Sequence, residues 1–190
     1  MIYFFRKDKD PHEYDDMLDM PYPYASAHKR MDLIQRANQF APFAGVGHLD
    51  SHDGMVEVLP EEDYYPYTYS ELTDVAKKEQ NEKARPAYQG SLPDLGSYST
   101  IFIGAPVWWG DWPMIMYTVF ENNDFSGKKL IPFSTHEGSG LSGFDRKLQS
   151  ACPDAEVLKG LAVRGNDAQN SQDKVRESVN SWLKEFGFGD

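Results

Sequence analysis

The chain has 190 residues and a mass of 21.6 kDa, which is enough for one domain with an appendage. Its formal net charge of −11 disfavours nucleic acid and anionic membrane surfaces as partners, because both are themselves negative. No apolar stretch approaches the roughly 20 residues that cross a bilayer, no signal peptide is evident, and the single cysteine, Cys152, excludes an internal disulfide, so a cytoplasmic protein is the simplest expectation.

Residues 1–54 differ from the rest of the chain in composition and hydrophobic patterning, and they are predicted to form an atypical N-terminal segment. The apolar run at residues 1–5 predicts a strand. Residues 8–23 are acidic and punctuated by prolines, which predicts irregular structure. Residues 31–43 place apolar side chains on one face and predict a helix.

From residue 55 to residue 190, strand patterns and helix patterns alternate. Apolar runs rich in β-branched and aromatic residues predict buried strands at residues 55–59, 99–105, 129–134, 155–158 and 161–163. Helices are predicted at residues 70–85, 113–120, 141–151 and 171–186, with Ser142 as the cap of the third. This alternation predicts an α/β domain in which helices cover a parallel sheet.

The loop that follows the strand at 99–105 is rich in tryptophan, with Trp108, Trp109 and Trp112 in close succession. Indole faces suit stacking on a planar aromatic ring, and indole N–H groups can hydrogen-bond its rim. In an open α/β sheet, ligands bind beyond the carboxyl ends of the strands, where this loop is expected. The alternative is that some of these rings only cover the core, since large aromatic side chains are usually mostly buried.

The loop after the strand at 129–134 is rich in glycine and hydroxyl groups. Its glycines let backbone N–H groups approach a ligand closely, and His136 could donate to a carbonyl or a reduced ring nitrogen. The alternative is a capped turn with a surface histidine. Together, the two loops predict a site for a planar ligand formed by Pro106, Val107, Trp108, Trp109, Gly110, Thr135, His136, Glu137, Gly138, Ser139 and Gly140.

Three other features are predicted to be structural. The histidines and aspartates at residues 48–53 lack a recognised ligand spacing, so no metal site is expected there. Cys152 has no identifiable base, which favours a packed side chain over a nucleophile. Residues 61–69 combine acidic and tyrosine side chains and are expected to form a solvated loop with aromatic packing, although an acidic rim could also steer a cationic partner.

Three motifs in the chain resemble the flavodoxin-like family: YSTIFIGAPVWWG at residues 98–110, FSGKKLIPFSTHEGSG at 125–140 and LKGLAVRG at 158–165. The resemblance covers roughly residues 55–187. It implies a three-layer sandwich with a parallel sheet of strand order 2-1-3-4-5 and FMN at the switch point between strands one and three. In that order the first strand is central, and residues 1–5 are expected to occupy its position. By the same resemblance, the Trp108–Trp109 loop and the Thr135–Gly140 loop hold the isoalloxazine ring.

The N-terminus departs from that family pattern. Family members follow the first strand with a Ser/Thr- and Gly-rich loop that wraps the FMN phosphate at a helix start. Residues 6–11 (RKDKDP) contain none of these residue types, and Asp8 and Asp10 would face a dianion. FMN binding is therefore expected to be weakened or lost on the phosphate side, with the ring pocket retained.

Residues 12–46 instead resemble the small YolD-like family, through the stretches YDDMLDMP, SAHKRM and RANQFAPFA. This resemblance identifies a sequence module but implies no biochemical activity for it. The atypical segment is therefore expected to replace both the phosphate loop and the first helix.

Two hypotheses follow. The first is a flavodoxin-like electron carrier or oxidoreductase in which FMN does the redox chemistry and no side chain need act as a catalytic acid or base. Its partners would be a flavin or another planar aromatic molecule and a redox protein, and a homodimer is allowed. The alternative is a non-enzymatic descendant of the fold that serves as an interaction or small-ligand module. The missing phosphate loop favours the second hypothesis, whereas the retained tryptophans and the His136 loop favour the first.

Overall fold

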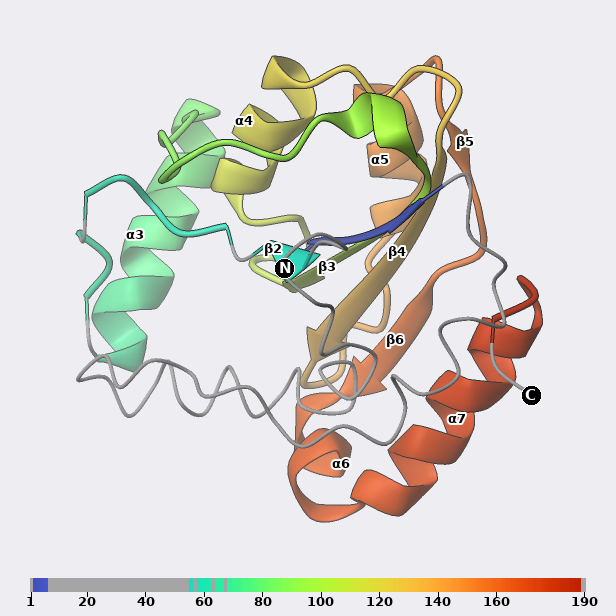
Figure 1. Cartoon of the computed structure of the whole chain (residues 1–190). Coiled ribbons are helices and arrows are strands. Elements are labelled where there is room, and N and C mark those ends of the chain that lie inside the picture. The colour runs from blue at the N-terminus through green and yellow to red at the C-terminus, as the bar shows by residue number, and fades with distance from the viewer. Residues whose placement is uncertain (1, 7–54, 57, 63, 67, 189–190) are drawn as a thin grey trace.

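The computed structural model describes residues 2–6, 55, 56, 58–62, 64–66 and 68–188 (Figure 1). The predictions for residues 8–23, 31–43 and 48–53 and the YolD-like resemblance at 12–46 lie outside these residues. The strands are β1 (Ile2–Arg6), β2 (Met55–Val56), β3 (Tyr98–Pro106), β4 (Lys129–His136), β5 (Glu156–Val157) and β6 (Leu161–Arg164). The helices are α3 (Tyr69–Glu82), the short 3-10 helix η2 (Leu95–Ser97), α4 (Met114–Asn122), α5 (Phe144–Ala151), α6 (Gly165–Asn170) and α7 (Gln172–Lys184).

One sheet connects the described strands in the order β2-β1-β3-β4-β5. β3 runs parallel to β4, and β4 runs parallel to both β5 and β6. β5 pairs with the start of β4 and β6 with its end, so the two short strands together form the edge that was predicted from residues 155–158 and 161–163. The prediction of an α/β fold with helices around a parallel sheet is confirmed.

β1 occupies the expected place between β2 and β3, but it runs antiparallel to both neighbours. Ile2 pairs with Ile103 near the carboxyl end of β3, and Arg6 pairs with Tyr98 at its amino end. The prediction of a wholly parallel sheet is therefore wrong at this strand. A short apolar run encodes burial but not direction, since parallel and antiparallel ladders place alternate side chains on the same two faces.

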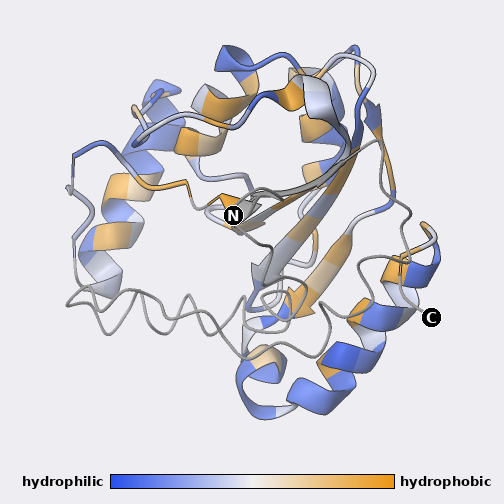
Figure 2. Ribbon diagram, viewed as in Figure 1, coloured by the Kyte–Doolittle hydropathy of each residue, from blue (hydrophilic) through white to orange (hydrophobic). Residues whose placement is uncertain are grey.

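Helices cover both faces of the sheet (Figure 1). Ile101 and Ile103 of β3 enter a core with α4 and α5, whereas Phe102 enters the opposite core with α6 and α7. Because alternate residues of β3 are buried on opposite faces, the strand needs the unbroken apolar run seen in the sequence. α7 buries a stripe at Val175, Val179, Trp182 and Leu183, as predicted, and its outer surface is largely hydrophilic (Figure 2).

The connection from β4 into α5 differs from the prediction. Ser142 does not cap the helix: its φ is 51°, and its hydroxyl donates to the Ser139 carbonyl at 3.1 Å. α5 begins only at Phe144, after Gly143 at φ 70°. Two consecutive left-handed residues are needed to turn the chain back onto the sheet, so helical geometry starts later than composition suggests.

Within the described part of the chain, no helix combines the length and the apolar composition that crossing a bilayer requires.

Candidate functional site

The structure brings the two predicted loops together at the carboxyl edge of the sheet. β3 ends at Pro106 and β4 at His136, and Pro106 pairs with Thr135 in register. Just beyond this pair, the Val107 N–H donates to the Thr135 carbonyl at 3.0 Å. The loops therefore leave the sheet side by side, in the place where open α/β sheets bind ligands.

A tight turn shapes the tryptophan loop. The N–H of Trp108 donates to the Asp111 carbonyl at 2.9 Å, and the N–H of Asp111 donates back at 3.0 Å. The two central residues, Trp109 and Gly110, both have positive φ, 51° and 72°. Such a two-residue turn needs left-handed geometry at both positions, which explains the glycine and shows that Trp109 is held in an uncommon conformation.

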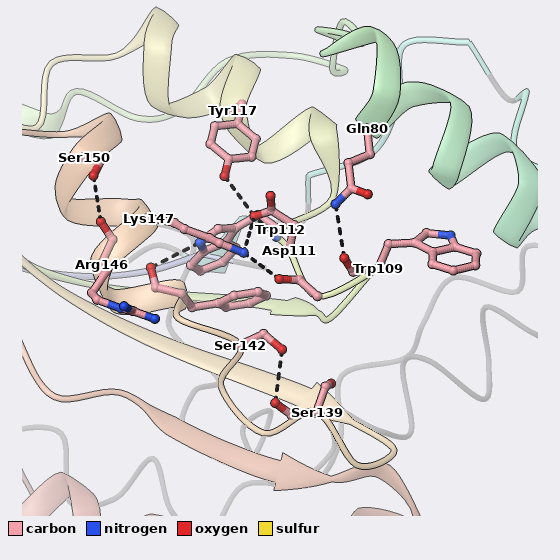
Figure 3. A network of polar contacts seen from close by, with 12 residues as sticks. Gln80, Trp109, Asp111, Trp112, Tyr117, Ser139, Ser142, Arg146, Lys147 and Ser150 are labelled. Carbon is pink, nitrogen blue, oxygen red and sulfur yellow. Dashed lines mark hydrogen bonds and ion pairs between the residues drawn. The ribbon is translucent and has the colours of Figure 1, made fainter.

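Side chains from two helices fix this turn in place (Figure 3). The Lys147 ammonium of α5 donates to the Gly110 carbonyl at 2.5 Å and forms an ion pair with Asp111 at 3.1 Å. The Tyr117 hydroxyl of α4 donates to the same Asp111 carboxylate at 2.9 Å. Burial and the neighbouring Asp111 raise the pKa of Tyr117, so the phenol stays protonated and remains a donor.

The three tryptophans of the loop have three different environments. Trp112 is 1% exposed: its ring stacks on Phe144 with centroids 3.7 Å apart, and its N–H donates to the Phe144 carbonyl at 3.2 Å. For Trp112, the structure therefore bears out the alternative that the ring covers the core. Trp109 is 53% exposed, and Trp108 is intermediate between them.

Trp109 points toward α3 and away from Trp112 (Figure 3). Its indole N–H donates to the Thr73 carbonyl at 2.9 Å, and the Lys77 ammonium lies 4.9 Å from its ring centroid. The Gln80 side chain donates to the Trp109 carbonyl at 3.2 Å. One face of α3 therefore holds Trp109, while about half of the indole stays open to solvent.

Trp108 packs edge-on against Tyr65, with ring centroids 5.4 Å apart. Behind this contact lies Glu79 of α3, which is only 7% exposed. Its carboxylate accepts hydrogen bonds from Tyr64 at 2.5 Å and from Tyr65 at 3.1 Å. Burial raises the pKa of Glu79, and burial next to that carboxylate also raises the pKa of both phenols.

Sequence reasoning assigned Tyr64 and Tyr65 only to aromatic packing in a solvated loop and did not single out Glu79. A signal existed, because Leu72, Ala76 and Glu79 lie at i, i+4 and i+7, so the glutamate continues the buried stripe of α3. Buried carboxylates need hydrogen-bond donors, and the tyrosines before the helix supply them.

The second loop is organised by its own polar groups. Thr135 is 1% exposed, and the Ser134 hydroxyl donates to the Gly140 carbonyl at 3.2 Å. The Gly138 N–H donates to Nδ1 of His136 at 2.9 Å. Since Nδ1 accepts, the neutral imidazole carries its proton on Nε2, which leaves Nε2–H as its donor.

The electrostatics around His136 favour this neutral form. Burial, together with the positive charge of Arg164, lowers the pKa of His136, although Glu137 and Asp167 act in the opposite direction. Arg164 is itself paired with Glu137 at 3.4 Å.

Backbone is exposed on both loops. Among the residues that the structure describes, an added Cβ at Gly110, Gly138 or Gly140 would meet nothing within 4 Å, so these leave open space over the three glycines. A flat ligand can therefore approach the main chain closely at these points. Over the residues with described positions, no group of three or more potential metal ligands forms.

Comparison with known proteins identifies relatives of this architecture. A family model described as flavodoxin matches residues 52–184. A candidate flavoprotein from Bacteroides uniformis ATCC 8492 is 26% identical, with 78% of this chain and 90% of that chain covered at a TM-score of 0.58. A candidate flavoprotein from Bacteroides eggerthii DSM 20697 is 23% identical, with 80% and 87% covered at a TM-score of 0.56.

A flavoprotein from Lactobacillus acidophilus NCFM, solved in complex with FMN, is 21% identical, with 62% and 78% covered at a TM-score of 0.49. No curated protein matches the chain in sequence.

Proposed function

Because the chain belongs to the flavodoxin family, we propose that it binds the ring of a flavin between the Trp108–Asp111 turn and the Thr135–Gly140 loop and takes part in electron transfer. The observation that carries this proposal is the junction of the two loops, where Val107 bonds to Thr135 across the carboxyl edge of the sheet. The description of the Bacteroides relatives as candidate flavoproteins is in line with it.

The ring side of the site fits a flavin. Trp108 and Trp109 bring indole surface to one loop, and Gly138 and Gly140 leave open space over the other. The isoalloxazine ring is flat, apolar on its faces and polar at its rim, so it matches an aromatic surface beside exposed backbone groups.

The described residues do not fit the phosphate of FMN. In the family arrangement, the loop after the first strand starts at the carboxyl edge and wraps the phosphate. Here β1 runs the other way, so its end at Arg6 lies beside Tyr98, at the opposite edge of the sheet. β1 therefore ends at the edge of the sheet opposite the ring loops, and the described residues of β1 give the phosphate no such loop.

The chain's own groups have clear tasks at the ring. When bound, a flavin supplies one- and two-electron redox chemistry, and the protein supplies binding, orientation and electrostatics. Trp108 offers stacking surface, and the Nε2–H of His136 offers a hydrogen bond to an acceptor on the ring rim. A net charge of −11 would favour a redox partner with a basic surface, and the single cysteine is consistent with work in the cytoplasm.

Titration of the full-length protein with riboflavin, followed by flavin fluorescence, tests the proposal. We expect quenching for the wild type and a loss of affinity in Trp108→Ala of roughly 5- to 150-fold, the equivalent of about 1–3 kcal/mol for one stacked ring. Tyr69→Ala is the matched control, because Tyr69 is an aromatic residue that is 82% exposed, at the start of α3. It should bind like the wild type.

Circular dichroism of each variant establishes that it is folded, and Trp108→Phe, which keeps a ring, should bind with intermediate affinity. If neither riboflavin nor FMN is quenched at roughly 100 μM, the flavin proposal is wrong. That result would favour the alternative, an interaction module built on the same fold.

A further inference from the structure

We infer that the site recognises the flavin by its ring alone, so that riboflavin, which has no phosphate, binds as well as FMN. This inference rests on the proposed function and concerns the ligand class of the same site. Four observations carry it: the direction of β1, the helix starts at the carboxyl edge, the pairing of the cations there and the charge of the N-terminal segment.

The direction of β1 removes the usual place for a phosphate. A phosphate site in this class of fold forms where a strand passes into a helix at the carboxyl edge, because backbone N–H groups and the helix dipole converge there. At that edge, β1 presents its beginning, Ile2, next to Ile103 of β3 and Val56 of β2. The strand-to-helix turn that would hold the phosphate is therefore not formed by β1.

The helices that follow β3, β4 and β6 at the carboxyl edge are poor substitutes. The first turn of α4 consists of Met114, Ile115 and Met116, all of them buried, so no open anion site forms there. α5 and α6 each carry an aspartate in the first turn, Asp145 and Asp167. A carboxylate at that position already interacts with the positive end of the helix and repels a second anion.

Three of the four basic side chains that the structure describes near the loops are already engaged. Lys147 is held by Asp111 and the Gly110 carbonyl, and Arg164 by Glu137. Lys77 lies over the Trp109 ring and donates to the Gln80 side chain at 2.9 Å. Arg146 is exposed and forms no ion pair with any residue that the structure describes. It is therefore the cation to test.

The segment between β1 and β2 does not supply a basic patch by composition. Residues 7–54 contain nine acidic and five basic side chains. A phosphomonoester carries about −1.5 to −2 charges near neutral pH. The negative charge of the segment and of the whole protein therefore disfavours binding of the phosphate, whereas a neutral ribityl chain is not repelled.

The test is a comparison of dissociation constants for riboflavin and FMN, measured on the full chain by flavin fluorescence at physiological salt. We expect the two constants to agree within about threefold. Binding of FMN more than about threefold more tightly than riboflavin would overturn the inference and leave the proposed function standing. Failure of both ligands to bind would refute the proposed function and the inference together.

Salt and charge variants sharpen the comparison. Contacts between a phosphate and cations weaken as salt rises, so we expect no loss of FMN affinity relative to riboflavin between about 0.05 and about 0.5 M NaCl. Arg146→Gln should leave both affinities unchanged, whereas Trp108→Ala should weaken both by the same factor. A loss confined to FMN, in high salt or in Arg146→Gln, would show that the phosphate is held and would overturn the inference.

Discussion

The contrast between Trp112 and Trp109 gives a prediction whose size follows directly from their surroundings. Trp112 is 1% exposed, stacks on Phe144 at 3.7 Å, meets Phe120 edge-on at 5.4 Å and donates to the Phe144 carbonyl. Replacing a buried aromatic residue by alanine usually costs about 3–5 kcal/mol, and the carbonyl left without its donor places Trp112→Ala near the top of that range.

Two companion variants grade the loss of packing. Trp112→Phe keeps a six-membered ring against Phe144 but removes the five-membered ring and its N–H, so we expect a smaller loss than for Trp112→Ala, about 1–3 kcal/mol. Trp109→Ala removes a side chain that is 53% exposed, together with one hydrogen bond to Thr73. We expect it to cost about 1 kcal/mol.

Urea unfolding followed by far-ultraviolet circular dichroism measures these losses, because that signal does not depend on the tryptophan removed. The slope of stability against urea should be the same for all four proteins if each unfolds in one cooperative step. A loss below about 2 kcal/mol for Trp112→Ala, or an equal loss for Trp109→Ala, would refute the assignment of Trp112 to the core and of Trp109 to the surface.

The remaining predictions concern two other buried groups. Burial raises the pKa of Glu79, so the folded protein holds a proton there more readily than the unfolded chain, and stability falls as the pH rises from the usual value near 4.5 through the raised one. Glu79→Gln removes this titration, so its stability relative to the wild type, measured by urea unfolding, should increase from about pH 4 to about pH 7, and a constant difference would contradict the argument. Burial also raises the pKa of the Cys152 thiol to about 11. At about pH 8 the native protein should therefore react with a thiol reagent at least roughly tenfold more slowly than the urea-unfolded protein, and equal rates would show that the thiol is accessible.

Much of the architecture could be predicted from local patterns. The continuous apolar runs at residues 99–105 and 129–134 marked the two central parallel strands, and the stripe through Val175, Val179 and Trp182 marked α7. These patterns are informative because buried side chains recur along the chain with the period of the secondary structure, which is about 2 residues in a strand and about 3.6 in a helix. The same reasoning located both loops, since a loop must follow the strand that it leaves.

The burial and the contacts of each side chain in the loops could not be predicted in this way. Trp112 meets Phe144, and Trp109 meets Thr73, which lies 36 positions earlier in the chain. Neighbouring tryptophans of one short loop were indistinguishable by composition, and only the positions of α3 and α5 decided which of them is buried. Glu79 is a similar case, because its hydrogen bonds come from Tyr64 and Tyr65, before the helix begins.

The sequence by itself thus determined the family, most of the strands and the two loops at the carboxyl edge of the sheet, because those properties depend on residue types and their spacing along the chain. Only the tertiary structure decided the direction of β1, and with it that β1 itself forms no strand-to-helix turn beside Ile103, where a phosphate would lie. The direction of a strand is defined by which of its ends lies beside which end of the neighbouring strand. Five apolar residues can be buried equally well in either direction, so their sequence does not select one.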